Sequence, residues 1–127
     1  MQSLLLVAAG GAAGAVLRHL VGAAAFRTLG GGWPYGTLAV NVMGGLLMGV
    51  LVGWLALRGA GDQERWRLLL GVGGLGGFTT FSAFSLETVL MLERREWSSA
   101  AAYSILSVAL SVGALMLGLA LMRRVLA

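Results

Sequence analysis

The sequence predicts an all-α membrane protein that crosses the bilayer four times. Its 127 residues are 58% hydrophobic and only 11% charged, whereas soluble domains are about 45–50% apolar and about 25% charged. The mean hydropathy of +0.89 describes more apolar surface than a soluble core could bury. Four apolar segments alternate with short polar connections, and each has the roughly 17–25 residues that a membrane helix needs. We therefore expect a single transmembrane domain over residues 1–127.

The expected spans follow one another with little sequence between them. They cover about residues 4–25, 35–57, 68–92 and 100–122. The first span begins directly after Met1-Gln2-Ser3, without the basic residues that open a signal peptide, so we expect it to be retained. Tryptophans fall near the span ends, as aromatic residues at membrane interfaces do: Trp33, Trp54, Trp66 and Trp97.

All nine basic residues are arginines, and the net charge is +4. Because most lie near span ends, where they anchor in lipid headgroups, the charge does not indicate a nucleic-acid partner. Four spans place both termini on one side. That side has Arg58, Arg65, Arg67, Arg123 and Arg124, and the other has Arg18, Arg27, Arg94 and Arg95. A protein that inserts one way shows a clear excess, so this near balance favours dual topology and an antiparallel homodimer.

The densest glycine run lies in the third span. Gly71–Gly77 holds five glycines in seven residues, each costing about 1 kcal/mol relative to alanine in a helix. Two threonines follow, and we expect the helix to break near Gly76–Thr79. Backbone freed in lipid needs a partner such as a bound cation or a water-lined cavity; the alternative is a flexible packing helix. Other glycines have the spacing of close helix packing: Gly10, Gly11 and Gly14, then Gly45, Gly49 and Gly53.

Two further features gather near the expected break. After it, helical periodicity places Phe81, Phe84, Ser85 and Thr88 on one face. The positive edges of the rings beside hydroxyls suit a poorly solvated anion, although a phenylalanine pair more commonly serves packing. In the second span, Asn41 is the strongest polar group, and its amide either bonds a neighbouring helix or lines a pathway.

The remaining spans carry a polar stripe and intramembrane charges. Tyr103, Ser107 and Ser111 are spaced by four residues on the fourth span, and the stripe serves either interhelical hydrogen bonds or a pathway. Arg18 and Glu87 are functional candidates because charge inside a membrane is costly. Arg18 either snorkels to the interface or draws anions toward a pore.

Several classes of function are disfavoured. The chain has no cysteine and one histidine, which leaves no thiol nucleophile and no multi-histidine metal site in one copy, and we do not expect an enzyme. A small dual-topology multidrug or cation exporter would need a buried carboxylate in its first span, where this chain has Arg18 and no acid. A non-transporting assembly protein would leave Asn41 and the Phe81–Phe84 face unexplained.

Three blocks of sequence resemble the Fluc (CrcB-type) fluoride channels, and the resemblance covers essentially the whole chain. The blocks are GGAAGAVLRH at 10–19, GTLAVNVMG at 36–44 and GGFTTFSAF at 76–84. The resemblance implies a passive channel that exports fluoride and lowers its cytoplasmic level. It also implies an antiparallel dual-topology homodimer with two pores. Each chain would be a multi-pass protein of the bacterial inner membrane.

The resemblance also implies roles for particular residues. Asn41 would coordinate fluoride, with Phe81 and Phe84 offering ring edges. Tyr103, Ser107 and Ser111 would continue a polar track. Arg18 would lie near the aqueous mouth, and Glu87 would be an acid in the vestibule. The backbone carbonyls of Gly76 and Thr79 would hold a structural sodium ion. Ala83 departs from the family's usual threonine, which removes a hydroxyl beside the track. Fluoride is strongly hydrated, so Asn41, Thr80 and Ser107 are expected to replace its water without a fixed charge deep in the pore.

Overall fold

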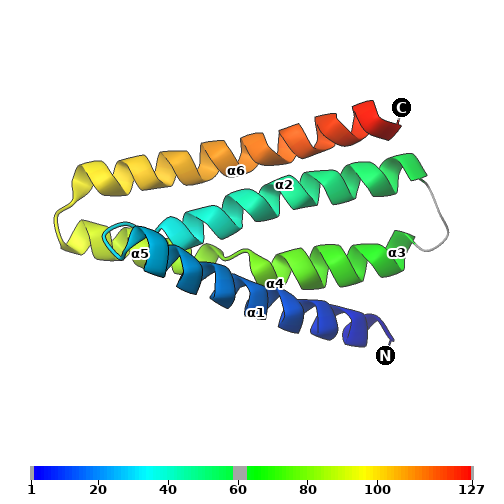
Figure 1. Cartoon of the computed structure of the whole chain (residues 1–127), viewed down its shortest axis with the longest axis horizontal. Coiled ribbons are helices and arrows are strands. Elements are labelled where there is room, and N and C mark those ends of the chain that lie inside the picture. The colour runs from blue at the N-terminus through cyan, green and yellow to red at the C-terminus, as the bar shows by residue number, and fades with distance from the viewer. Residues whose placement is uncertain (1, 59–62, 127) are drawn as a thin grey trace.

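The computed structural model describes residues 2–58 and 63–126, and this part of the chain is almost entirely helical. Four segments are long and apolar enough to cross a membrane, which confirms the predicted all-helical chain with four candidate spans. They are Gln2–Leu29, Tyr35–Leu57, Gln63–Glu93 and Trp97–Leu126. In Figure 1 the chain runs back and forth along the bundle, and its two ends lie at the same end of the molecule.

Three crossings are single helices and the third is divided. The single helices are α1 (Gln2–Leu29), α2 (Tyr35–Arg58) and α6 (Trp97–Leu126). The third crossing consists of α3 (Gln63–Trp66), the π-helix η1 (Arg67–Leu75), α4 (Gly76–Phe78) and α5 (Phe81–Glu93). The helices run past the predicted spans because hydropathy reports the hydrocarbon thickness, whereas a helix continues into the headgroup layer. The second predicted connection falls partly on residues 59–62, which lie outside the described residues.

Local sequence explains the ends of α1 and α2. Gly30 takes φ +81° and donates its N–H to the Phe26 carbonyl at 2.9 Å. Glycine has no Cβ and adopts this left-handed conformation readily, so it ends the helix. Pro34 directly precedes α2, and its carbonyl accepts from the N–H of Leu38 at 3.2 Å. The connection is therefore short and turns the chain back at one membrane face.

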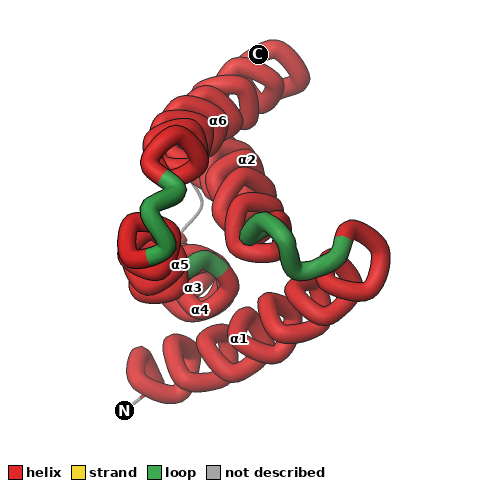
Figure 2. The backbone as a smooth tube through the Cα atoms, turned by 90° about the vertical axis from the view of Figure 1, so that its left-hand side faces the viewer, coloured by secondary structure: helices red, strands yellow, loops and turns green. Residues whose placement is uncertain are grey.

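Glycines let α1 lie directly on the third crossing. A Cβ added to Gly14 would overlap the backbone carbonyl of Gly74 and the N–H of Phe78, and one on Gly10 would meet the backbone of Leu69 and Gly74. The end-on view in Figure 2 shows α1 crossing the segment that contains α3 and α4. The glycines of this run are helical, in π form up to Leu75. The glycine-rich run is thus a backbone-to-backbone contact surface.

Glycines also join α2 to α6. A Cβ on Gly45 would meet the Ser111 carbonyl at 2.6 Å, and one on Gly49 would overlap the backbone of Leu115. From the opposite side, a Cβ on Gly118 would overlap the Leu46 carbonyl. Small residues at this spacing bring helix backbones together in lipid, where dispersion contacts rather than water exclusion drive packing. This pairing fixes which face of α6 looks into the bundle.

Replacing Gly14 by alanine is expected to destabilise the folded protein by several kcal/mol, because the new methyl group meets backbone that cannot move aside. Gly22→Ala is the matched control on the same helix, since nothing lies within 4 Å of its added Cβ. That substitution should be neutral or slightly stabilising through helix propensity. Thermal unfolding in detergent, followed by size-exclusion chromatography, measures both. Equal stability of the two variants would show that the α1 contact is not tight.

Candidate functional site

The third crossing leaves helical conformation at two residues. Thr79 has φ −81° and ψ 160°, and Thr80 has φ −150° and ψ 119°. Thr79 still donates its N–H to the Leu75 carbonyl at 3.0 Å, which closes the preceding helix. The Thr80 hydroxyl accepts from the N–H of Ala83 at 3.1 Å and caps α5. Threonine suits both tasks, because its β-branch favours extended backbone and its hydroxyl is a good N-cap.

Asn41 of α2 clamps the extended backbone of Thr80. Its Nδ2 donates to the Thr80 carbonyl at 3.0 Å, and its Oδ1 accepts from the Thr80 N–H at 2.8 Å. In an unbroken helix that N–H would bond the carbonyl of Gly76, four residues earlier. One of the two expectations for Asn41, a bond to a neighbouring helix, is met. Because the amide has two donor hydrogens and this clamp uses one, a second N–H remains for a ligand.

Aromatic rings continue toward one membrane face from the two extended residues Thr79 and Thr80, which together form the interruption of the third crossing. The centroids of Phe81 and Phe84 lie 5.5 Å apart, and Phe84 lies 5.2 Å from the ring of Tyr103. Tyr103 in turn meets Trp33 edge-on at 5.3 Å. Tyr103 is fully buried, whereas Phe81 is 78% exposed on the single chain. On the predicted Phe81–Phe84 face, Phe84 therefore packs on the buried Tyr103, whereas Phe81 is largely exposed.

A carboxylate lies at the outer end of this row. Glu87 Oε1 accepts from the Thr37 hydroxyl at 2.5 Å and from the Tyr103 hydroxyl at 3.4 Å. These bonds join α5 to α2 and α6. Sequence reasoning did not single out Thr37, although its position four residues before Asn41 puts both on one face of α2. This spacing from Asn41 could have identified Thr37 as a candidate site residue.

Beyond Tyr103, the polar stripe of α6 faces inward without making hydrogen bonds at its two serines. Among side chains in the described residues, the hydroxyl oxygens of Ser107 and Ser111 are buried and have no partner. Ser111 lies at the α2 contact, where Gly45 has no side chain to offer. The interhelical bonds that one interpretation expected are therefore absent at these two hydroxyls. A buried hydroxyl without a partner is costly, and it marks a place where a ligand or water belongs.

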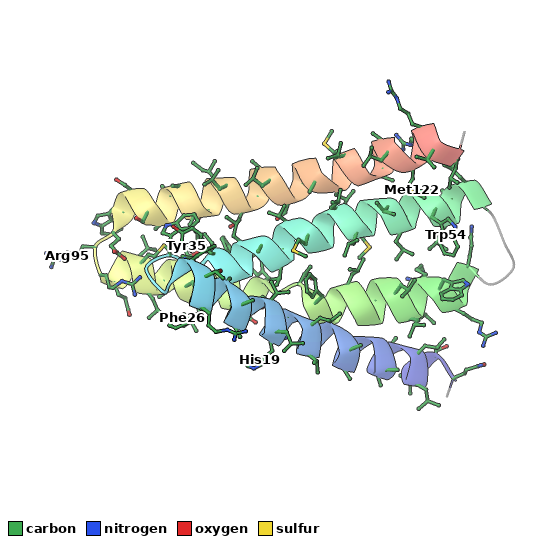
Figure 3. All side chains as sticks on the ribbon, viewed as in Figure 1. His19, Phe26, Tyr35, Trp54, Arg95 and Met122 are labelled. Atoms are coloured by element: carbon green, nitrogen blue, oxygen red, sulfur yellow. The ribbon has the colours of Figure 1, made fainter. Side chains whose placement is uncertain are left out.

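A cavity of about 400 Å³ opens at the membrane face beside Glu87. Its lining comes from the end of α1, the connection to α2, the start of α2, and α5 with the residue after it. It includes Phe26, Trp33, Tyr35, Thr37, Glu87 and Arg94. Figure 3 shows Phe26 and Tyr35 at the same end of the bundle as Arg95. The cavity has both an acidic and a basic side chain on its walls, so it can hold water at the outer end of the aromatic row.

The remaining predicted site residues lie at the interruption itself. Arg18 does not line the cavity; its Nε donates to the Gly77 carbonyl at 3.1 Å. Gly76 is exposed and Thr79 is half-buried, and their carbonyls stand on either side of that contact along the chain. The structure thus brings Asn41 and Thr80 together, and Glu87 with Tyr103. It places Arg18 beside the interruption.

Comparison with known proteins identifies the family of this chain. Residues 5–119 match the profile of the family described as "CrcB-like protein, Camphor Resistance (CrcB)". A protein of Phenylobacterium zucineum named "Fluoride-specific ion channel FluC" is 67% identical over 127 residues, covering all of both chains. Proteins of the same name from Caulobacter sp. and Caulobacter vibrioides are 62% and 59% identical, covering 98% and 100% of each chain. With a full-length match and identity this high, the chain belongs to the CrcB-like family.

Proposed function

We propose that this protein is a passive fluoride channel that lets fluoride leave the cytoplasm and so lowers its level there. The relatives that match it over at least 98% of their length are named "Fluoride-specific ion channel FluC", which supports a fluoride channel. The observation that carries the proposal is the pair of buried hydroxyls without partners, Ser107 and Ser111, on the same stripe as Tyr103. Hydrogen-bond donors left unpaired in a membrane suit a small anion that gives up its water.

The proposed path uses neutral donors along most of its length. The second Nδ2 hydrogen of Asn41, the hydroxyls of Ser107 and Ser111, and the ring edges of Phe81 and Phe84 would each replace part of the hydration shell. None carries a fixed charge, so the ion would be stabilised without being trapped. The single carboxylate on the row, Glu87, lies at the cavity and already accepts from Thr37 and Tyr103.

The working form is proposed to be an antiparallel homodimer with two pores. Irregular backbone does not face lipid, because its polar groups would lack partners. In a single chain, however, Gly76 and Phe81 on either side of the interruption are exposed. A second copy of opposite orientation would cover them, since Thr79 and Thr80 lie near the middle of the crossing Gln63–Glu93 and the two interruptions would meet at one depth. The near balance of arginines between the faces supports both orientations.

A structural sodium ion is proposed at the meeting point of the two interruptions. The donor set fits a hard cation, which prefers oxygen ligands. The carbonyls of Gly76 and Thr79 would hold it, and the extended ψ of 160° at Thr79 turns its carbonyl out of the helical ladder. The ion would supply positive charge that satisfies these oxygens and joins the two copies. The chain's own part is to aim the carbonyls, through the clamp by Asn41.

Fluoride efflux from liposomes tests the function. Purified protein is reconstituted in vesicles loaded with potassium fluoride or potassium chloride, and efflux is started with valinomycin and followed with an ion-selective electrode. We expect fast fluoride loss with chloride retained, and no loss of either ion from protein-free vesicles. Folded protein that releases no fluoride, or releases chloride equally fast, would contradict the proposal. Placement in the bacterial inner membrane would be tested by fractionating cells that express the chain.

A further inference from the structure

One stripe of α1 ends in an arginine. Gly10, Gly14 and Arg18 are spaced by four residues and therefore lie on one face of the helix. The two glycines seat α1 directly on the backbone of the third crossing. One turn further on, Arg18 Nε donates to the Gly77 carbonyl at 3.1 Å. The next residue, His19, is exposed and in Figure 3 points away from the bundle. Arg18 is thus directed at the third crossing by the helix packing.

The carbonyl that Arg18 contacts has lost its helical partner. In an unbroken helix, the Gly77 carbonyl would accept from the N–H of Phe81, four residues later. Phe81 is the first residue of α5, beyond the two extended threonines. Arg18 replaces that bond with a charge-assisted one, which is stronger than a neutral hydrogen bond. The interruption is consequently held from two sides, by Asn41 on the Thr80 peptide and by Arg18 on Gly77.

We propose that Arg18 is a positioning residue that holds the interruption open through its Nε–H, and that this donor rather than the positive charge is what the site requires. The part of the proposal that concerns the cation rests on the proposed function: Gly77 lies between Gly76 and Thr79, so fixing its carbonyl would fix the two proposed sodium ligands. The charge itself opposes a cation. Donor and charge therefore act in opposite directions, and they can be separated.

Two neutral substitutions of equal length separate them. In Arg18→Gln, the amide Nε2 occupies the same place along the side chain as the arginine Nε, so the donor is kept and the charge is lost. Arg18→Met has the same number of side-chain heavy atoms as far as that position but no donor. Arg27→Gln and Arg27→Met are matched controls, because Arg27 lies in the last turn of α1 and makes no hydrogen bond among the described residues.

Amide hydrogen exchange, measured by mass spectrometry on the purified full-length protein, reports the positioning without any flux. We expect exchange in the peptide spanning residues 76–84 to be about ten- to hundredfold faster in Arg18→Met than in the wild type, the weight of a hydrogen bond to a charged group. Arg18→Gln should stay within about fivefold of the wild type. Unchanged exchange in Arg18→Met, or equal acceleration in both variants, would overturn the proposal. If Arg18→Met does not fold, Arg18→Gln decides alone. Exchange more than about tenfold faster than in the wild type would overturn the proposal, and exchange at the wild-type rate would support it.

The sodium dependence of fluoride efflux provides a second readout, in which the sodium requirement should change differently in the two variants. With sodium replaced stepwise by N-methyl-D-glucamine, Arg18→Met should need at least about fivefold more sodium for half-maximal efflux. Arg18→Gln should need the same amount or less, because repulsion is removed and the carbonyls stay in place. Arg18→Met with an unchanged or lower requirement would overturn the cation part. Wild-type efflux that ignores sodium would instead reject the cation site itself, and the exchange comparison would still decide the role of Arg18.

Discussion

Asn41→Leu is expected to lower fluoride efflux at least a hundredfold. Leucine has the same number of side-chain heavy atoms and the same branching at Cγ, so the shape is largely kept, but the Thr80 N–H and carbonyl both lose their partners. Each buried backbone group left unpaired costs about 1–3 kcal/mol. The extended backbone would shift, and the proposed path would also lose the remaining amide N–H of Asn41. Efflux from liposomes, measured with a fluoride electrode and divided by the amount of reconstituted protein, checks the result.

Two companion variants sharpen the Asn41 test. Asn41→Asp keeps an acceptor for the Thr80 N–H, loses the donor to its carbonyl and adds a charge, so it should also fail to conduct. Thr28→Val is the control for removing a polar group from a membrane helix, since the Thr28 hydroxyl bonds the Ala24 carbonyl of its own helix at 2.9 Å. It should conduct as the wild type does. Wild-type efflux in Asn41→Leu would exclude the amide from the path.

Phe81→Ile is expected to lower fluoride efflux at least tenfold while the proposed dimer stays intact. The ring is 78% exposed on the single chain, so its loss removes little intramolecular packing. What is lost is the positive ring edge that an aliphatic side chain cannot offer to an anion. Phe84→Ile should have a similar effect on efflux and a larger one on stability, because Phe84 also packs on Tyr103 at 5.2 Å.

The contrast between the two phenylalanines makes the result interpretable. The free energy of unfolding, measured by thermal denaturation, should fall by less than about 1 kcal/mol in Phe81→Ile and by about 1–3 kcal/mol in Phe84→Ile. Leu86→Ile serves as the control, because Leu86 is 60% exposed on the same helix and the exchange conserves volume. Unaltered efflux in both phenylalanine variants would remove the ring edges from the mechanism. Loss of the proposed dimer in Phe81→Ile, measured by size-exclusion chromatography, would assign that ring to assembly instead.

Hydropathy was sufficient to locate the four crossings, because bilayer thickness alone requires apolar segments of a certain length. It could not identify the π-helix η1, since an added residue per turn leaves composition unchanged. Glycine content suggested where regular helix would fail, yet Gly71–Gly77 is helical and the extended residues are Thr79 and Thr80. Gly73, Gly74 and Gly77 are held by backbone contact with α1, a tertiary effect that intrinsic propensity does not contain.

Contacts between crossings were the hardest to anticipate. Asn41 was recognised as exceptional, but its partner Thr80 depends on the rotation of α2 about its own axis. The bond between Thr37 and Glu87 depends on the same rotation and was not anticipated. Arg18 was placed near the aqueous mouth because the family resemblance suggested it, and the structure gives it Gly77 as a partner. Periodicity in a single sequence shows which residues share a face of a helix. Which neighbouring helix that face contacts depends on how the small residues pack, and the sequence alone does not show it.

The pairing of α2 with α6 has a consequence for biogenesis. The Tyr103–Ser111 stripe is carried by α6 (Trp97–Leu126), which leaves the ribosome after α1 to α5. The contact of α1 with η1 and α4 involves earlier residues and can form first. A nascent chain that stops before residue 97 would therefore contain the interruption and the aromatic pair but none of the unpaired hydroxyls. On the proposed path, a translation product without α6 would lack these donors and would not conduct.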